Sequence, residues 1–125
     1  MSEIRIRATP RPTARVVGDT TIVELSGEID MLTAPCVGAR LDVLTVRPLP
    51  DLVVDLRSVS FIDCTGLGVL CRVANHVRAR QGRLRLVTDN PRFRRILRLT
   101  RLSGAFEVCA VPPGAAAMPS STDVA

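Results

Sequence analysis

Residues 55–70, DLRSVSFIDCTGLGVL, contain the transition between elements that decides the fold. The apolar run that ends at Leu56 predicts a buried strand, a short loop follows it, and an apolar helical pattern begins at Thr65. Thr65 is therefore expected at a helix N-terminus, with the carboxylate of Asp63 two residues before it. Such a helix end has unpaired backbone N–H groups and a partial positive charge, so it accommodates an added phosphate.

The elements before this stretch are expected to be a short strand, a hairpin and a helix. Ile4–Arg7 alternates between apolar and basic residues and predicts an edge strand. Gly18 and Asp19 lie between two apolar runs and predict a tight turn, after which a strand runs from Thr20 to Ser26. A helix follows, with Thr33 as its cap and a proline in its first turn. The residues predicted on its buried face are Val37, Leu41 and Leu44.

Two helices and two strands are expected beyond Leu56. The helix that begins at Thr65 is expected to run to Gln81 and to stop at Gly82. A strand over residues 83–88, a helix that opens at Asn90 and a last strand over residues 106–111 follow. The predicted buried stripe of the first of these helices is Leu67, Leu70, Cys71, Ala74 and Val77, and that of the second is Phe93, Ile96, Leu97 and Thr100.

This alternation of strands and helices predicts an α/β fold, a single domain in which helices cover an open mixed β-sheet. At 125 residues the chain is long enough for one ordinary hydrophobic core. The expected divisions are an N-terminal edge strand and connector over residues 1–14, the domain over residues 15–111, and a tail over residues 112–125. The tail is rich in Pro, Ala and Ser, and we expect it to be disordered.

Composition favours a soluble, cytoplasmic protein without membrane insertion. Hydrophobic residues make up 46% of the chain and charged residues 23%, which is typical of a globular domain. No apolar stretch approaches the ~20 residues that cross a bilayer, and the N-terminus lacks a secretory apolar region. The cysteines, at positions 36, 64, 71 and 109, have neither a zinc-binding nor a paired spacing, so we expect free and mostly buried thiols.

The formal net charge is +5, and all seventeen basic residues are arginine, so an acidic partner or a nucleic acid must be considered. The chain has no Trp or Tyr and no helix-turn-helix pattern, which disfavours nucleic-acid binding. Four of the arginines form a basic face on the predicted third helix, which is either a solvated surface or a contact for an acidic partner. These are Arg94, Arg95, Arg98 and Arg101.

The sequence predicts no catalytic residue, cofactor or metal site. Asp30 and Asp63 are candidates for paired carboxylates or for a Mg²⁺ site, but the chain has no convincing third ligand for them. It also has no nucleophile–base pair, and its single histidine, His76, falls well inside a predicted helix. We therefore do not expect an enzyme.

Four segments of the sequence resemble STAS domains, specifically the bacterial anti-sigma factor antagonists, over roughly residues 15–111. In order along the chain they are Leu25–Asp30, Val53–Leu56, Asp63–Gly68 and Leu84–Thr88. In that family the phosphorylated residue directly precedes the glycine of a Gly-Leu-Gly segment, and the matching residue here is Thr65. A serine that is common just before it in the family is replaced by Cys64.

The resemblance implies a binding module that is switched by phosphorylation. The unmodified protein would bind an anti-sigma factor, itself a serine/threonine kinase, and so free a sigma factor. Phosphorylation at Thr65 would abolish this binding, and a protein phosphatase would restore it. Any ATP and metal would belong to the partner. The residues implied to lie at the partner surface are Asp30, Asp63, Cys64, Thr65, Gly66, Leu67 and Gly68.

Several alternatives stay open at the level of sequence. Thr65 is also suited to be the N-cap of its helix, a role compatible with phosphorylation. Gly66 and Gly68 indicate close approach either by a partner or by the sheet. The alternative functions are a non-switching STAS subunit of a transport or signalling complex and, from the arginine excess, nucleic-acid binding.

Overall fold

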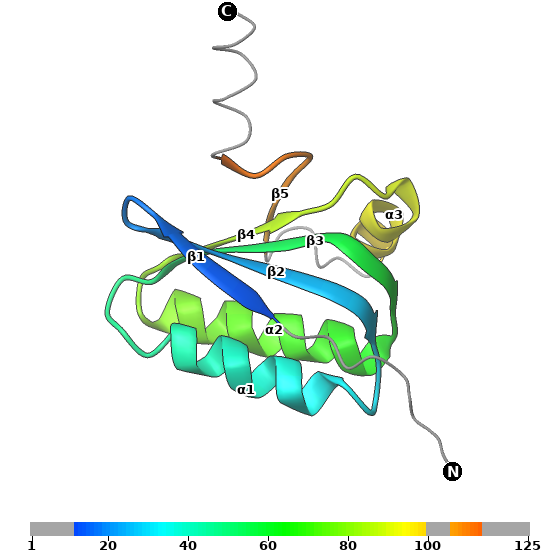
Figure 1. The fold of residues 1–125 in the computed structure, drawn as a ribbon, viewed down its shortest axis with the longest axis horizontal. Helices are drawn as coiled ribbons and strands as arrows, with labels where there is room; N and C mark the ends of the chain where they lie inside the picture. The colour runs from blue at the N-terminus through cyan, green and yellow to red at the C-terminus, as the bar shows by residue number, and fades with distance from the viewer. Residues whose placement is uncertain (1–11, 100–105, 114–125) are drawn as a thin grey trace, which may run out of the picture.

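The computed structural model describes residues 12–99 and 106–113 of the chain. Five strands form one mixed sheet in the order β1-β2-β3-β4-β5, in which β1 is antiparallel to β2 and all other neighbours are parallel. Helices α1 and α2 lie side by side across one face of the sheet, and α3 lies apart from them beyond the end of β4 (Figure 1). The elements are β1 Thr13–Val17, β2 Thr20–Ile29, α1 Ala34–Leu44, β3 Asp51–Ile62, α2 Cys64–Ala79, β4 Arg83–Val87, α3 Pro91–Leu99 and β5 Glu107–Cys109. The predicted α/β fold is confirmed.

The main core lies between the sheet and the pair α1 and α2. Each parallel crossover must return across the sheet, and the apolar stripe of each crossover helix is buried there. On α1, Val37 and Leu41 are buried as predicted, whereas Leu44 is half-buried. The core residues from the strands include Val23, Leu25, Leu52, Val54, Leu84 and Leu86.

Three of the five residues predicted on the buried stripe of α2 are buried, namely Leu70, Ala74 and Val77. The buried residues of this helix are Gly66, Val69, Leu70, Val73, Ala74 and Val77. Leu67 and Cys71, which we predicted to be buried, are half-exposed at the margin of the core. The buried face also includes Gly66, because the first turn packs this glycine against Ile29 and Ile62 at the ends of β2 and β3.

Strand β3 is longer than predicted, since it continues past Leu56 to Ile62. Its second half remains paired with β2, where Ser26 lies opposite Ser58 and Ile29 lies opposite Ile62. Two register irregularities interrupt this pairing, and they explain why the polar segment lacks a clean alternating pattern. Ser58 and Ser60, predicted as loop residues, therefore belong to a strand.

The turn at Gly18 and Asp19 is confirmed, with Gly18 at a φ of 64°. The stop after α2 differs from the prediction, because the residue in the left-handed conformation is Gln81, with a φ of 58°, and not Gly82. Gly82 has another role. A Cβ atom at Gly82 would overlap the carbonyl oxygen of Pro50, so a side chain there would separate the starts of β3 and β4.

The remaining expectations concern the two ends of the chain. Strand β1 begins at Thr13, so the expected boundary at residue 15 cuts a strand. Strand β5 spans Glu107–Cys109, shorter than the predicted 106–111. The strand predicted at Ile4–Arg7, Thr100 on the third helix and most of the predicted tail lie outside the described residues.

Candidate functional site

The loop after β2 and the start of α2 are joined at one end of the sheet. Ile29 and Ile62 are paired at the ends of β2 and β3, and the Asp63 amide donates to the Ile29 carbonyl oxygen at 3.1 Å. The loop after β2 and the first turn of α2 are thereby held side by side (Figure 1). Asp30 and Thr65, which the resemblance implies to lie at the partner surface, thus follow strand ends that meet at one end of the sheet.

Asp63, and not Thr65, is the N-cap of α2. Its backbone is extended, and its carboxylate oxygen Oδ1 accepts a hydrogen bond from the Gly66 amide at 3.0 Å. The Leu67 amide donates to the Asp63 carbonyl oxygen at 2.9 Å. The helix therefore begins at Cys64, one residue earlier than predicted, and the capping role suggested for Thr65 belongs to the carboxylate before it.

Thr65 occupies the second position of the helix, where its hydroxyl is not needed for capping. The residue is exposed, and within the described ranges its hydroxyl makes no hydrogen bond to another residue. Cys64 is exposed beside it. The first turn of α2 thus presents an accessible hydroxyl at a helix end of partial positive charge.

The loop after β2 is held by Asp30 and Thr33. The Asp30 carboxylate oxygen Oδ1 accepts from the amides of Leu32 at 3.0 Å and Thr33 at 3.2 Å. The hydroxyl of Thr33 donates back to the Glu28 carbonyl oxygen at 2.7 Å and makes no capping bond to α1. Thr33 stands at the predicted cap position of α1, but its hydroxyl fastens the loop and does not cap the helix.

This loop exposes two large apolar residues that the sequence analysis did not select. Met31 is 70% exposed and Leu32 is 76% exposed, while the backbone around them is hydrogen-bonded. Their position in the sequence could have indicated their exposure, because the two residues directly follow Asp30 and precede the periodic apolar stripe of α1. Exposed apolar side chains that lie together and are rimmed by polar groups are typical of protein contact sites.

The two glycines of α2 have different surroundings. A Cβ atom at Gly66 would lie 2.6 Å from a side-chain carbon of Ile62 and 2.8 Å from the carbonyl oxygen of Ile29, so this glycine permits packing of the helix on the strand ends. Gly68 is exposed, and a Cβ atom there would have no neighbour within 4 Å. Packing against the sheet therefore explains Gly66, and nothing among the described residues explains Gly68.

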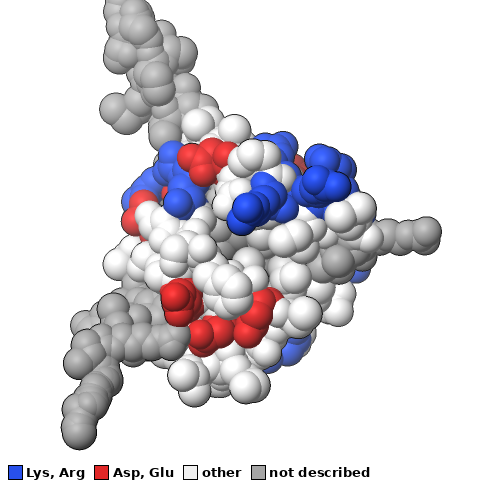
Figure 2. Space-filling view, turned by 90° about the vertical axis from the view of Figure 1, so that its right-hand side faces the viewer, with Lys and Arg blue, Asp and Glu red and all other residues white. Residues whose placement is uncertain are grey.

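The end of the molecule that carries these loops has an uneven charge distribution. Figure 2 shows a group of acidic side chains below the centre of this face and most of the arginine side chains along its upper part, where some acidic side chains lie among them. Glu28, Asp30 and Asp63 belong to the strand end, loop and helix start described above, and none of the three is buried. A phosphate added at Thr65 would join this acidic neighbourhood.

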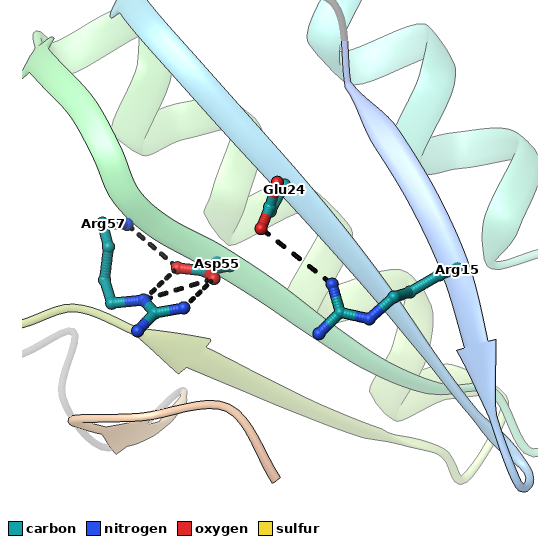
Figure 3. Close-up of polar contacts among 4 residues, drawn as sticks. All are labelled: Arg15, Glu24, Asp55 and Arg57. Atoms are coloured by element: carbon teal, nitrogen blue, oxygen red, sulfur yellow. Dashed lines mark hydrogen bonds and ion pairs between the residues drawn. The ribbon is translucent and has the colours of Figure 1, made fainter. Parts of the chain in front are cut away.

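A separate polar group on β3 has a structural role. Asp55 is 3% exposed on the sheet face opposite Val54, and its oxygen Oδ2 accepts from a terminal guanidinium nitrogen of Arg57 at 2.9 Å (Figure 3). This hydrogen bond raises the pKa of Arg57. The Arg57 amide also donates to Asp55 Oδ1 at 3.0 Å. The buried carboxylate of Asp55 is thus paired with a guanidinium and hydrogen-bonded, which offsets the free-energy cost of burying its charge.

The described ranges contain no cluster of three or more His, Cys, Asp or Glu residues that could hold a metal ion. Nor do they include a helix long and apolar enough to cross a membrane. All four cysteines are free, but the expectation that they are mostly buried is wrong. Cys36 and Cys64 are exposed because they lie on the solvent sides of the first turns of α1 and α2, while Cys71 and Cys109 are half-buried.

The family model of the STAS domain matches residues 11–112, which span every described strand and helix. The chain belongs to the STAS domain family. This agrees with the resemblance seen in the sequence and with the mixed sheet of five strands.

Curated relatives and solved structures narrow the resemblance to one branch of the family. An anti-sigma-B factor antagonist of Listeria monocytogenes is 38% identical over 72% of this chain and 81% of its own length. The anti-sigma-B factor antagonist of Bacillus subtilis is 33% identical over 74% of this chain and 84% of its own. The crystal structure of an anti-sigma factor antagonist from Mycobacterium paratuberculosis is 28% identical and covers 87% of this chain and 92% of its own, with a TM-score of 0.74.

Proposed function

We propose that this STAS domain is an anti-sigma factor antagonist whose binding to an anti-sigma factor is controlled by phosphorylation of Thr65. The observation that carries the proposal is an exposed threonine hydroxyl at the second position of α2, in a chain that is 38% identical to an anti-sigma-B factor antagonist. In this proposal the unmodified protein occupies the anti-sigma factor and so frees a sigma factor.

The proposed docking surface comprises the Asp30 loop and the first turn of α2. Met31 and Leu32 supply exposed apolar area, and the bare backbone at Gly68 lets a partner approach the helix closely. Asp30 and Asp63 hold the two segments in shape through their backbone hydrogen bonds. Leu67 contributes less to the surface, since it packs partly against the core.

Phosphorylation would act on this surface through charge and desolvation. A phosphothreonine carries about −1.5 to −2 charges, and at position 65 it would stand close to the Asp63 carboxylate. The helix end tolerates the phosphate, whereas a docked partner would have to bury it beside other acids. An unfavourable contact of ~3 kcal/mol weakens binding by about two orders of magnitude, which is enough for a switch.

The phosphate would come from the partner. We propose that the anti-sigma factor is a serine/threonine kinase that transfers the γ-phosphoryl group of ATP to the Thr65 oxygen, with a base and Mg²⁺ of its own. The hydroxyl proton passes to that base and ADP leaves. A protein phosphatase would hydrolyse the ester and regenerate the binding form. All three proteins would act in the cytoplasm.

The test is a phosphorylation and binding assay with the cognate anti-sigma factor. Incubation with the kinase and ATP should add one phosphate, mapped to Thr65, and the phosphorylated protein should bind at least about a hundredfold more weakly. Thr65→Val keeps the branched shape without the hydroxyl and should bind without being modified. Ser58→Ala, in strand β3, should behave like wild type.

Two results would contradict the proposal. Stoichiometric phosphate on Ser58 or Ser60 with Thr65 unmodified would place the switch elsewhere. Tight binding that no phosphorylation alters would favour the alternative of a non-switching STAS subunit.

A further inference from the structure

A second recessed surface lies between the last residues of β3 and helix α3. It is a groove of about 230 Å³. Its walls include Val59, Phe61 and Ile62 from β3 and Arg92, Phe93 and Ile96 from α3. This surface shares no residue with the Thr65 site proposed above, apart from the strand end at Ile62 that supports both.

The size of the groove favours a side chain as its occupant. Sites for cofactors and drug-sized ligands usually have volumes of about 300–1,000 Å³. A groove of about 230 Å³ is too small for most of these and accommodates one bulky apolar side chain. Phe61 is 52% exposed and Ile96 is 39% exposed at its margins, so an incoming side chain would cover apolar area that now faces water.

Two of the uncharged polar residues that line the groove, Thr88 and Asn90, already bond to the backbone. The Thr88 hydroxyl accepts from the Asn90 amide at 3.2 Å, and the Asn90 side-chain oxygen accepts from the amides of Arg92 at 2.9 Å and Phe93 at 3.4 Å. These bonds cap the N-terminus of α3 and leave its first amides occupied. What the groove offers to a ligand is therefore mainly apolar area, together with the exposed Ser60 hydroxyl and the guanidinium of Arg92.

The rim of the groove carries positive charge without an acidic partner. Arg92 lines the groove, and Arg95 follows it by three residues on the same side of α3. Both are exposed, and neither forms an ion pair with another described residue. No acidic residue occurs from position 90 to position 106. Figure 2 shows arginine side chains along this upper part of the molecule.

We propose that this groove binds an acidic peptide segment of a partner protein. One bulky apolar side chain of the peptide occupies the groove between Phe61 and Ile96, and neighbouring carboxylates pair with Arg92 and Arg95. Arginine suits this role because its planar guanidinium forms paired hydrogen bonds with a carboxylate. The apolar area lines a recess about the size of one side chain, which favours a peptide over a lipid surface.

The test titrates the isotope-labelled full chain with three short synthetic peptides and follows backbone amide signals by NMR. The first peptide alternates Glu and Leu around one central Phe, the second has Gln in place of every Glu, and the third has Ala in place of Phe. The first should shift the signals of Phe61, Arg92 and Ile96, and the other two should bind at least about tenfold more weakly.

A matched pair of variants distinguishes a local ion pair at Arg92 from a general effect of net charge on peptide affinity. Arg92→Glu should weaken the first peptide by at least about tenfold. Arg40→Glu changes the net charge equally on an exposed position of α1, which lies apart from α3 (Figure 1), and it should change affinity by less than about threefold. Ile96→Ala removes a groove wall without changing charge and should also weaken binding. The NMR spectrum of each variant confirms its fold.

Several outcomes would overturn the inference. They are the absence of shifts at millimolar peptide, shifts that map elsewhere, or equal losses for Arg92→Glu and Arg40→Glu. Binding of anionic phosphatidylserine vesicles or of an RNA oligonucleotide in preference to the first peptide would also overturn it. Thr65→Asp should leave peptide binding unchanged, so failure of the phosphorylation switch and failure of this groove are separate results.

Discussion

At the scale of the residue, Asp63 and Thr65 divide two roles that the sequence assigned to one position. Because Asp63 caps α2, Thr65→Ala should leave the free energy of unfolding nearly unchanged. Asp63→Ala should lower it by about 0.5–2 kcal/mol, and Asp63→Asn, which keeps a capping oxygen, should recover most of the loss. Urea denaturation of the three variants measures this. An equal loss for Thr65→Ala and Asp63→Ala would contradict the assignment of the cap.

A negative charge at position 65 should weaken binding to the anti-sigma factor. Thr65→Asp introduces one negative charge beside Asp63 and should weaken binding to the anti-sigma factor, while Thr65→Ala should bind and not be released by ATP. Titration calorimetry with the kinase, with and without ATP, measures both. An aspartate carries less charge than a phosphate. If Thr65→Asp binds as tightly as wild type, the affinity of the phosphorylated protein must therefore be measured before the switch is rejected.

The two glycines of the first turns of α2 form a natural pair of tests. Gly66→Ala should destabilise the fold, since its Cβ atom would lie 2.8 Å from the backbone oxygen of Ile29. Gly68→Ala enters open space and should stabilise the helix by up to about 0.8–1.0 kcal/mol. Thermal denaturation checks both signs. If Gly68→Ala is stable yet binds the anti-sigma factor poorly, the partner contacts the backbone there.

At the scale of the element, the pairing of β5 with β4 includes a salt bridge between their first residues. Arg83 donates from its terminal nitrogen to a Glu107 oxygen at 2.7 Å and from Nε to the other at 2.9 Å. These bonds hold the pKa of Glu107 below its usual value of 4.5 and raise that of Arg83. Both side chains are about half exposed, so the pair is screened by salt.

The pH dependence of this pair has a definite sign. Since the pKa of Glu107 is lower in the folded state, its stabilisation is present above the unfolded carboxyl pKa and is lost as the pH falls through the folded value. NMR titration should place the Glu107 transition below that of an ordinary glutamate at low salt and closer to it at high salt. Glu107→Gln should make stability less dependent on pH in that acidic range. An unshifted titration would mean that the pair does not persist in solution.

At the scale of the whole molecule, the proposed partner surface is confined to one end of the sheet and should not require the C-terminal tail. Pro112 is buried, so a chain that ends at Pro113 is a better truncation than one that ends at Val111. This truncation should keep affinity for the anti-sigma factor within a few-fold. Asp30→Ala should alter binding or phosphorylation at Thr65, because its carboxylate shapes the loop that exposes Met31 and Leu32. The reverse pattern would place the interface elsewhere.

The order of elements and the neighbourhood of the site could be predicted from the sequence, because both depend on local signals. Apolar runs of strand length, a Gly-Asp turn and helical periodicity are properties of short segments, and they led to an α/β sheet with Thr65 near a helix start. The resemblance to STAS domains then implied that Asp30 and Thr65 lie at the partner surface. These inferences required no knowledge of distant contacts.

Other features depend on which segments meet in three dimensions. The polar second half of β3 is a strand because β2 lies beside it with an irregular register, and no local pattern indicates that partner. Gly66 sets the buried face of α2 because it meets Ile29 and Ile62, and Gly82 is required because Pro50 lies against it. The sequence by itself determined the elements and the chemistry available at their ends. The tertiary structure decided which of those groups cap, which pack and which remain exposed, since burial and hydrogen-bond competition arise only between segments distant in the chain.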